Sequence, residues 1–72
     1  MAKIEAGMAG NVWKLLVKEG DTVTAGQDVV ILESMKMEIP VICEEGGTVA
    51  RIYVQEGDFV NDDDILVEIE LG

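Results

Sequence analysis

The sequence contains no histidine, one cysteine, and only five basic residues against fifteen acidic ones. Without histidine it can form neither a Ser-His-Asp triad nor a Cys-His nucleophile pair, and a zinc site of the usual kind is excluded as well. One cysteine cannot build a disulfide framework. The net charge of −10 argues against a nucleic acid partner, because phosphate backbones attract basic proteins. We therefore expect no catalytic residue, no metal site and no nucleic acid partner.

The sequence also lacks any apolar stretch close to the roughly 18 residues that a helix needs to cross a bilayer. No signal-peptide pattern opens it, so we expect no membrane partner. The lone cysteine and the absence of a targeting segment favour the cytoplasm. No stretch has the composition of a linker or of a low-complexity region, and 72 residues suffice for one small domain, expected to span 1–72.

The residues that are abundant favour β-strands. Ten Val, seven Ile and three Thr make up twenty of the 72 residues, and β-branched side chains are enriched in strands. Eight glycines, spread along the chain, would interrupt any helix longer than a few turns. The composition therefore predicts an all-β fold.

The chain contains an internal repeat. Residues 10–33 align without a gap with residues 47–70, 37 positions later, and nine of the 24 aligned pairs are identical. Both copies contain the triplet Glu-Gly-Asp, which predicts a turn because Gly can adopt positive φ and Asp can bond its local backbone. Two copies are too few for a solenoid, so the repeat predicts two matched halves packed about a pseudo-two-fold axis.

Alternating apolar residues on both sides of each turn predict strands with one inward face. The residues expected to point inward are Trp13, Leu15, Val17, Val23, Val30 and Leu32 in the first copy, and Ala50, Ile52, Val54, Val60, Val67 and Ile69 in the second. Val29 and Ile31 make the last strand of the first copy apolar on both faces, so we expect both to be covered. The pattern predicts two small antiparallel sheets face to face, as a flattened sandwich or barrel.

The segment that joins the copies, residues 34–46, has no counterpart in the aligned repeat. Two strand-like runs, 29–33 and 38–43, flank the sequence Ser-Met-Lys-Met, which predicts a hairpin with Met35 and Lys36 at its tip. Tight hairpin turns favour Asn-Gly or Asp-Gly, because their central residues need positive φ. A departure from local turn preferences indicates a functional constraint. Lys36 is therefore the leading candidate for a functional residue.

The sequence Glu-Ser-Met-Lys-Met at 33–37, with Met-Ala-Gly at 8–10 and Glu-Gly-Asp-Phe-Val-Asn at 56–61, resembles the attachment site of the biotinyl-domain family. The resemblance covers essentially the whole chain. It implies a flattened β-barrel of two four-stranded antiparallel sheets, with the attachment lysine on a hairpin tip. It also implies that the cofactor is biotin, joined covalently to the side-chain amine of Lys36. Within the family, the sequence resembles short biotin/lipoyl attachment proteins and the carrier domain of acyl-CoA and pyruvate carboxylases.

This resemblance implies a carboxyl carrier and not an enzyme. A biotin protein ligase would modify Lys36, and the domain would carry a carboxyl group from a biotin carboxylase to a carboxyltransferase. Met35 and Met37 would then be recognition flanks for the ligase, although methionines can also fill a core. Glu33 is a further candidate for ligase recognition, but its repeat counterpart Glu70 fits a structural role at a strand end equally well.

Two alternatives stay open at this point. A lipoyl, or dual biotin and lipoyl, carrier of a dehydrogenase-type complex would use a lysine on the same fold. Lipoyl domains typically have Asp before the lysine and a small residue after it, whereas Met35 and Met37 stand here. An unmodified interaction module is the other alternative, against which Lys36 argues. Cys43 is expected to be a buried apolar side chain, because the adjacent Glu44-Glu45 pair disfavours a reactive thiolate.

Overall fold

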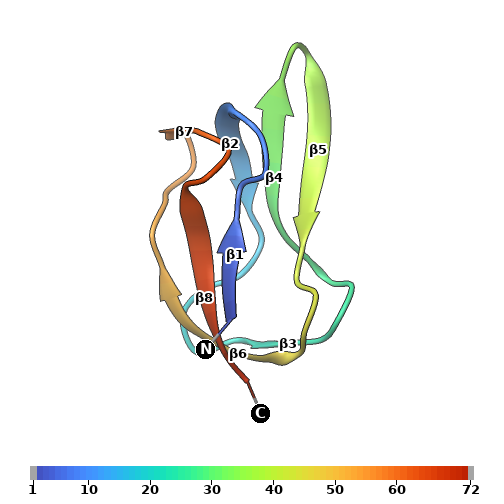
Figure 1. Ribbon diagram of the computed structural model, residues 1–72, viewed down its shortest axis with the longest axis vertical. Helices are drawn as coiled ribbons and strands as arrows, with labels where there is room; N and C mark the ends of the chain where they lie inside the picture. The colour runs from blue at the N-terminus through green and yellow to red at the C-terminus, as the bar shows by residue number, and fades with distance from the viewer. Residues whose placement is uncertain (1, 72) are drawn as a thin grey trace.

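The computed structural model describes residues 2–71, in which eight β-strands are present (Figure 1). Their bounds are β1 Ala2–Glu5, β2 Gly10–Leu15, β3 Thr22–Val23, β4 Asp28–Ser34, β5 Met37–Ile42, β6 Gly47–Ile52, β7 Phe59–Val60 and β8 Ile65–Leu71. Within these residues there is no helix long and apolar enough to cross a membrane.

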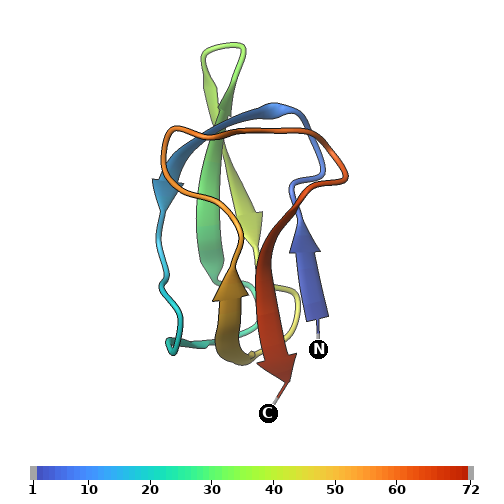
Figure 2. The same ribbon diagram turned by 90° about the vertical axis from the view of Figure 1, so that its left-hand side faces the viewer.

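The strands form two four-stranded antiparallel sheets that pack against each other (Figures 1 and 2). Sheet A has the order β1-β8-β6-β3, and sheet B has the order β5-β4-β2-β7. The predicted all-β fold of two four-stranded sheets is confirmed. The edge strands β1 and β5 carry Lys3 and Pro40, residue types that discourage pairing with a further strand.

A shift of 37 residues relates the two sheets along their whole length. It moves β2, β3 and β4 onto β6, β7 and β8, and it moves β1 onto the last four residues of β5. The same shift converts the strand order of sheet A into that of sheet B. The expectation that 34–46 has no counterpart was therefore wrong for β5. The sequence alignment missed this match because β1 and β5 share only their alternation, with Ala2, Ile4 and Ala6 matched by Ile39, Val41 and Cys43.

The two halves exchange strands instead of packing as separate units. In sheet A, β1 and β3 of the first half pair with β8 and β6 of the second. In sheet B, β5 and β7 of the second half pair with β4 and β2 of the first. Each sheet thus contains two strands from each half, and neither half can complete a sheet alone.

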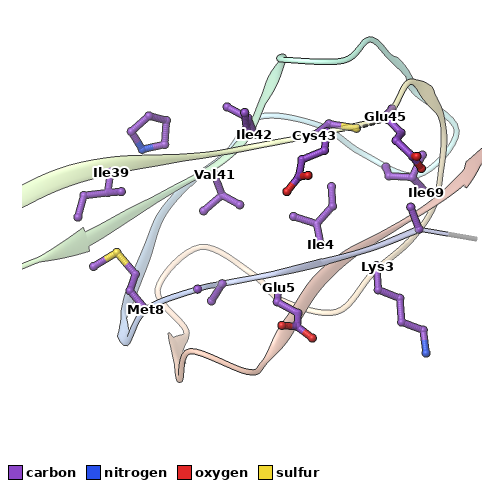
Figure 3. Close-up of a pocket in the computed structure, with 15 residues that line it drawn as sticks. Lys3, Ile4, Glu5, Met8, Ile39, Val41, Ile42, Cys43, Glu45 and Ile69 are labelled. Carbon is purple, nitrogen blue, oxygen red and sulfur yellow. Dashed lines mark hydrogen bonds between the residues drawn. The ribbon is translucent and has the colours of Figure 1, made fainter.

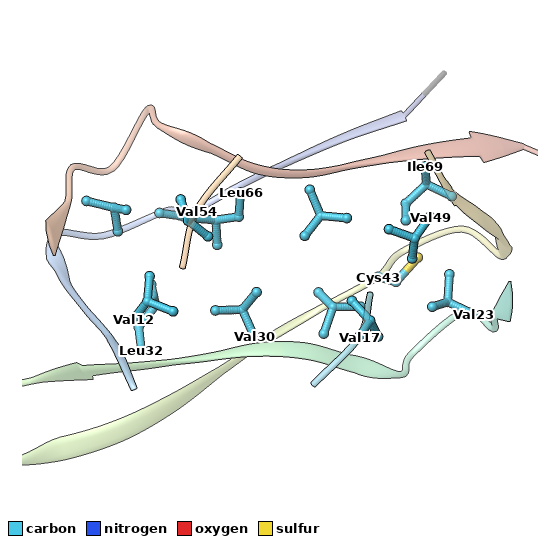
Figure 4. Close-up of a cluster of buried hydrophobic side chains, with 14 residues drawn as sticks. Val12, Val17, Val23, Val30, Leu32, Cys43, Val49, Val54, Leu66 and Ile69 are labelled. Carbon is cyan, nitrogen blue, oxygen red and sulfur yellow. The ribbon is translucent and has the colours of Figure 1, made fainter. Parts of the chain in front are cut away.

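The core between the sheets is entirely apolar (Figure 4). Complete burial of a Val, Leu or Ile side chain contributes about 1.5–3 kcal/mol, so these side chains supply most of the stabilising free energy. Cys43 is buried among them, as expected, and its thiol donates a hydrogen bond to the carbonyl oxygen of Glu45. The buried hydrophobic residues are Ala6, Val12, Val17, Val23, Val29, Val30, Leu32, Cys43, Val49, Val54, Val60, Leu66, Val67 and Ile69.

The predictions that Trp13 and Ala50 point inward were wrong. A β-bulge lies between Val12 and Lys14, so the extra residue interrupts the alternation and Val12 fills the core instead. Trp13 is 41% exposed. At the equivalent bulge in β6, between Val49 and Arg51, Val49 fills the core instead of Ala50. Ile31 also departs from expectation, since it is only half-buried on the outer face of β4, between Lys14 and Pro40 of the neighbouring strands.

Two glutamates form hydrogen bonds between the two halves. The Glu19 Oε2 atom accepts a hydrogen bond from the backbone N–H of Ile52 at 3.2 Å, and Glu56 Oε2 accepts one from the N–H of Leu15 at 3.0 Å. The remaining residues of each triplet shape the turn itself, through positive φ at Gly20 and Gly57 and side-chain acceptors at Asp21 and Asp58. The repeated Glu-Gly-Asp sequence is therefore structural.

Replacing either glutamate should destabilise the domain by a similar amount, because the two bonds are equivalent. We expect Glu19→Ala and Glu56→Ala each to lower the free energy of unfolding by about 1 kcal/mol, as for loss of one hydrogen bond. Urea denaturation followed by circular dichroism measures this. Glu19→Gln and Glu56→Gln keep an acceptor oxygen and are the matched controls. Equal stability of the Ala variants and the parent would show that these bonds contribute nothing.

Candidate functional site

The hairpin between β4 and β5 projects from one end of the molecule (Figures 1 and 2). The beginning of β1 and the end of β8 lie at the opposite end. Ser34 pairs with Met37 across the hairpin, which leaves Met35 and Lys36 as a two-residue turn. The predicted hairpin with Lys36 at its tip is confirmed.

Both turn residues adopt a left-handed backbone. The φ angles are 51° at Met35 and 65° at Lys36, as in the type I′ turns that match the twist of a hairpin. Asn and Gly tolerate this conformation, whereas for other residues it costs roughly 1–2 kcal/mol each. A tight turn of this type fixes the Cα position of Lys36, while its side chain extends into solvent.

The methionines beside the lysine lie on the surface. Met35 is 92% exposed and Met37 is 62% exposed, so the alternative that they belong to the core is wrong. Exposed apolar side chains that flank the lysine are available for contact with another protein. Their role as ligase recognition flanks stays a prediction.

Glu33 lies one residue before the paired end of β4 and is exposed. It is directly opposite Glu38 of β5 on one side and Asn11 of β2 on the other. Like charges directly opposite each other in a sheet are destabilising. The structure therefore brings Glu33, Met35, Lys36 and Met37 together at one end of sheet B, with a second carboxylate, Glu38, that the sequence did not single out.

Gly10 of β2 supports the base of the hairpin. A Cβ atom at this position would lie 2.8 Å from the carbonyl oxygen of Glu33 and 3.4 Å from Cβ of Ser34. Any side chain would push the two strands apart, because the nearest obstacle is backbone. Its identity with Gly47 in the repeat was the sequence signal for this close approach.

A shallow hollow of about 370 Å³ adjoins the hairpin. Lys36, Glu33 and Phe59 of β7 are among the residues that line it. Phe59 was not predicted as a site residue. Within 2–71, no group of three His, Cys, Asp or Glu side chains is placed to hold a metal ion.

A separate groove of about 580 Å³ runs between the edge strands β1 and β5 (Figure 3). Ile4, Val41 and Met8 lie along it, with Cys43 at one end. It contains none of the four predicted site residues. The candidate site is therefore the hairpin and its surroundings.

Comparison with known families agrees with this geometry. The model of a family described as "Biotin-requiring enzyme" matches residues 2–69. The chain belongs to the biotin/lipoyl attachment family. Its fold places the one lysine of the β4–β5 hairpin on an exposed turn, as covalent attachment requires.

Individual members of the attachment family are similar over most of the chain. The biotin/lipoyl attachment protein of Bacillus subtilis is 55% identical over 62 residues, which are 86% of this chain and 85% of that protein. The biotin carboxyl carrier protein of Streptococcus mutans is 45% identical over 64 residues, 89% of this chain and 49% of that protein. This chain thus spans most of the first relative and about half of the second.

A solved structure has the same arrangement. The urea carboxylase of Kluyveromyces lactis superposes with a TM-score of 0.89 at 33% identity, covering 96% of this chain and 6% of that one. The attachment-family fold therefore also occurs as a small part of a large carboxylase.

The backbone strain at the tip leads to a stability prediction for this attachment domain. Met35→Asn combined with Lys36→Gly introduces residues that favour positive φ, and we expect the free energy of unfolding to rise by about 1 kcal/mol. Urea denaturation of this variant and the parent measures the change. A variant with Asn and Gly exchanged, Met35→Gly with Lys36→Asn, should give a similar gain, because both positions have positive φ. Unchanged or lower stability in both variants would contradict the strain argument.

Proposed function

We propose that the domain, residues 1–72, is a biotin carboxyl carrier and that Lys36 is its attachment point. The observation that carries the proposal is a lysine on a two-residue turn where both φ angles are positive, in a member of the attachment family. A turn optimised for folding alone would use Asn-Gly. An exposed lysine there is explained by chemistry that needs its amine.

The side chain of Lys36 suits covalent biotin. It is a four-carbon stem that ends in a primary amine, which forms a stable amide with the carboxyl group of biotin. When bound, biotin supplies a ring that accepts and donates a carboxyl group. The strained turn and the β4–β5 ladder hold the base of this arm in place, and the exposure of residues 35–37 leaves it free to enter other active sites.

A biotin-dependent carboxylase is the system in which the domain works. One relative is named a biotin carboxyl carrier protein, and the fold recurs within a urea carboxylase. The carrier makes no bonds itself, and its proposed partners are a biotin carboxylase, a carboxyltransferase and a biotin protein ligase. The attacking amine has to be neutral, so the ligase must supply desolvation or a base. The proposal includes a cytoplasmic location, where the thiol of Cys43 stays reduced.

Lys36→Arg should abolish biotinylation and leave the fold intact. Arginine keeps the positive charge and the length of the side chain, but its guanidinium group is not an acyl acceptor. After coexpression with a biotin ligase, the intact mass of the parent should increase by one biotin, and that of the variant should not change. The variant retains Lys3, Lys14 and Lys18, which control for labelling of other amines.

The same spectrum separates the alternative cofactor, because lipoate and biotin add different masses. Labelling of the Arg variant at the level of the parent, detected with streptavidin, would refute Lys36 as the attachment point. Suppose that both ligases and both cofactors are supplied and the intact mass increases by one lipoyl group and no biotin. The domain would then be a lipoyl carrier and not a carboxyl carrier.

Moving the lysine by one position should also impair modification. In Met35→Lys with Lys36→Met, composition and charge are unchanged, but the amine leaves a different point of the turn. Misplacement of a reacting group by about 1 Å can lower a rate about 100-fold. A time course of biotin incorporation should show at least a tenfold slower initial rate, with circular dichroism confirming that both domains are folded. Equal rates would mean that the ligase reads a flexible peptide.

A further inference from the structure

The outer faces of the two sheets carry different residues at equivalent positions. The shift of 37 residues matches Lys3, Glu5 and Glu68 on sheet A with Pro40, Ile42 and Ile31 on sheet B. Charged side chains on one face therefore correspond to apolar side chains on the other. Since both faces belong to one repeated fold, the difference does not come from the fold itself.

On the outer face of sheet A, residues of opposite charge lie opposite each other on neighbouring strands. Glu68 of β8 is opposite Lys3 of β1 on one side and opposite Arg51 of β6 on the other. Its Oε1 atom also accepts a hydrogen bond from the hydroxyl of Tyr53 at 3.2 Å. Opposite charges across neighbouring strands stabilise a sheet. Glu68 therefore has partners of opposite charge within the domain.

The outer face of sheet B carries apolar side chains at positions that are charged in sheet A, and it includes two exposed aromatic side chains. The row equivalent to Lys3, Glu68 and Arg51 consists of Pro40, Ile31 and Lys14. Trp13 and Phe59, which are 41% and 63% exposed, occupy the positions of Ala50 and Thr22. Sheet A folds with Ala and Thr at these positions, so folding does not require aromatic residues there.

This face is continuous with the attachment hairpin. Glu38, Glu33, Asn11 and Phe59 form one row across sheet B, in that order, on strands β5, β4, β2 and β7. Phe59 and Lys36 line the same hollow. The surface around the lysine therefore combines an apolar side chain at one end of the row with two carboxylates at the other.

We propose that the outer face of sheet B docks on the biotin protein ligase, with Phe59 as its principal contact. The proposal rests on Lys36 being the attachment point. The ligase acts on the domain before any biotin is attached, and it must hold the amine within reacting distance of an activated carboxyl group. A two-residue turn offers too little surface for this, whereas the adjacent sheet face adds exposed apolar side chains, Phe59 and Trp13, on hydrogen-bonded strands.

The side chains on the outer face of sheet B indicate which side chains the ligase should have opposite them. The facing surface should contain an apolar depression for Phe59 and basic side chains opposite Glu33 and Glu38. A basic partner would relieve the repulsion between these two carboxylates, which the isolated domain leaves directly opposite each other. Buried aromatic anchors dominate many protein interfaces, and Phe59 is exposed enough to be buried by a partner.

The internal repeat suggests suitable substitutions, because each residue can be replaced by the one found at the equivalent position of the other half. Phe59→Thr and Trp13→Ala introduce the residues found at the equivalent positions 22 and 50. The matched control, Thr22→Phe, places the same aromatic side chain on the outer face of sheet A. Steady-state kinetics of biotin transfer to the unmodified full chain give KM and kcat for each variant, and circular dichroism verifies folding.

We expect Phe59→Thr to raise KM about tenfold, as for loss of an interface anchor, and to leave kcat within about twofold. Trp13→Ala should raise KM by a smaller factor, and Thr22→Phe should leave both constants unchanged. An unchanged KM for Phe59→Thr would overturn the docking proposal. If Lys36→Arg is still not labelled in that case, the attachment point stands and only the docking face is wrong.

A second measurement does not depend on substitutions. Isotope-labelled domain is mixed with unlabelled ligase without ATP, and backbone NMR signals are compared before and after. The proposal expects perturbation at Phe59, Asn11 and Ile31 in sheet B and none at Thr22, Thr48 and Glu68, their equivalents in sheet A. Perturbation confined to residues 34–37 would show that the ligase reads the hairpin alone and would overturn the proposal. Concentration-dependent perturbation of the same face without ligase, together with an unchanged KM, would identify a second copy of the domain as its occupant.

Discussion

The exchange of strands between the two halves is the constraint on which the rest of this structure depends. Because each sheet takes two strands from each half, the register of one half is set by the other, and the chain must form both sheets together. The bonds from Glu19 and Glu56 reinforce this dependence across the halves. A small domain without disulfides thereby obtains a rigid frame from non-local pairing and a purely apolar core.

Chain connectivity breaks this symmetry at one place. The hairpin between β4 and β5 corresponds, in the other half, to the space between the end of β8 and the beginning of β1. A closed turn therefore exists at only one end of the pair of sheets, and Lys36 occupies it. The left-handed backbone of this turn is imposed by the ladder below it, in which Ser34 pairs with Met37 and Glu33 with Glu38. A symmetric scaffold thus presents Lys36, the proposed attachment point, without any further device.

The sequence alone was sufficient for the features that depend on local pattern. Alternation, the spacing of the repeat and the unsuitable turn residues at 35–36 predicted the all-β fold, the pseudo-symmetry and the hairpin. Features that depend on one extra residue or on distant pairing could not be predicted in this way. The bulge at Trp13 changes the face of that side chain without changing composition. The exchange of β3 and β7 depends on pairing between segments that are far apart in the sequence. Phe59 becomes a candidate contact residue only when its position in sheet B, beside the hairpin, is known.

The repeat separates the demands of folding from those of function, because each half is a control for the other. Where the halves agree, as at Glu-Gly-Asp and at Gly10 and Gly47, the shared residues have structural reasons. Where exposed positions differ, as at Thr22 and Phe59, folding accepts either residue, so a docking surface can be added at little cost to stability. The hairpin offers no such freedom, since the residues that fold best there cannot carry the amine. Exposed apolar side chains promote self-association of the domain. The net charge of −10 opposes self-association, because copies of the domain repel one another.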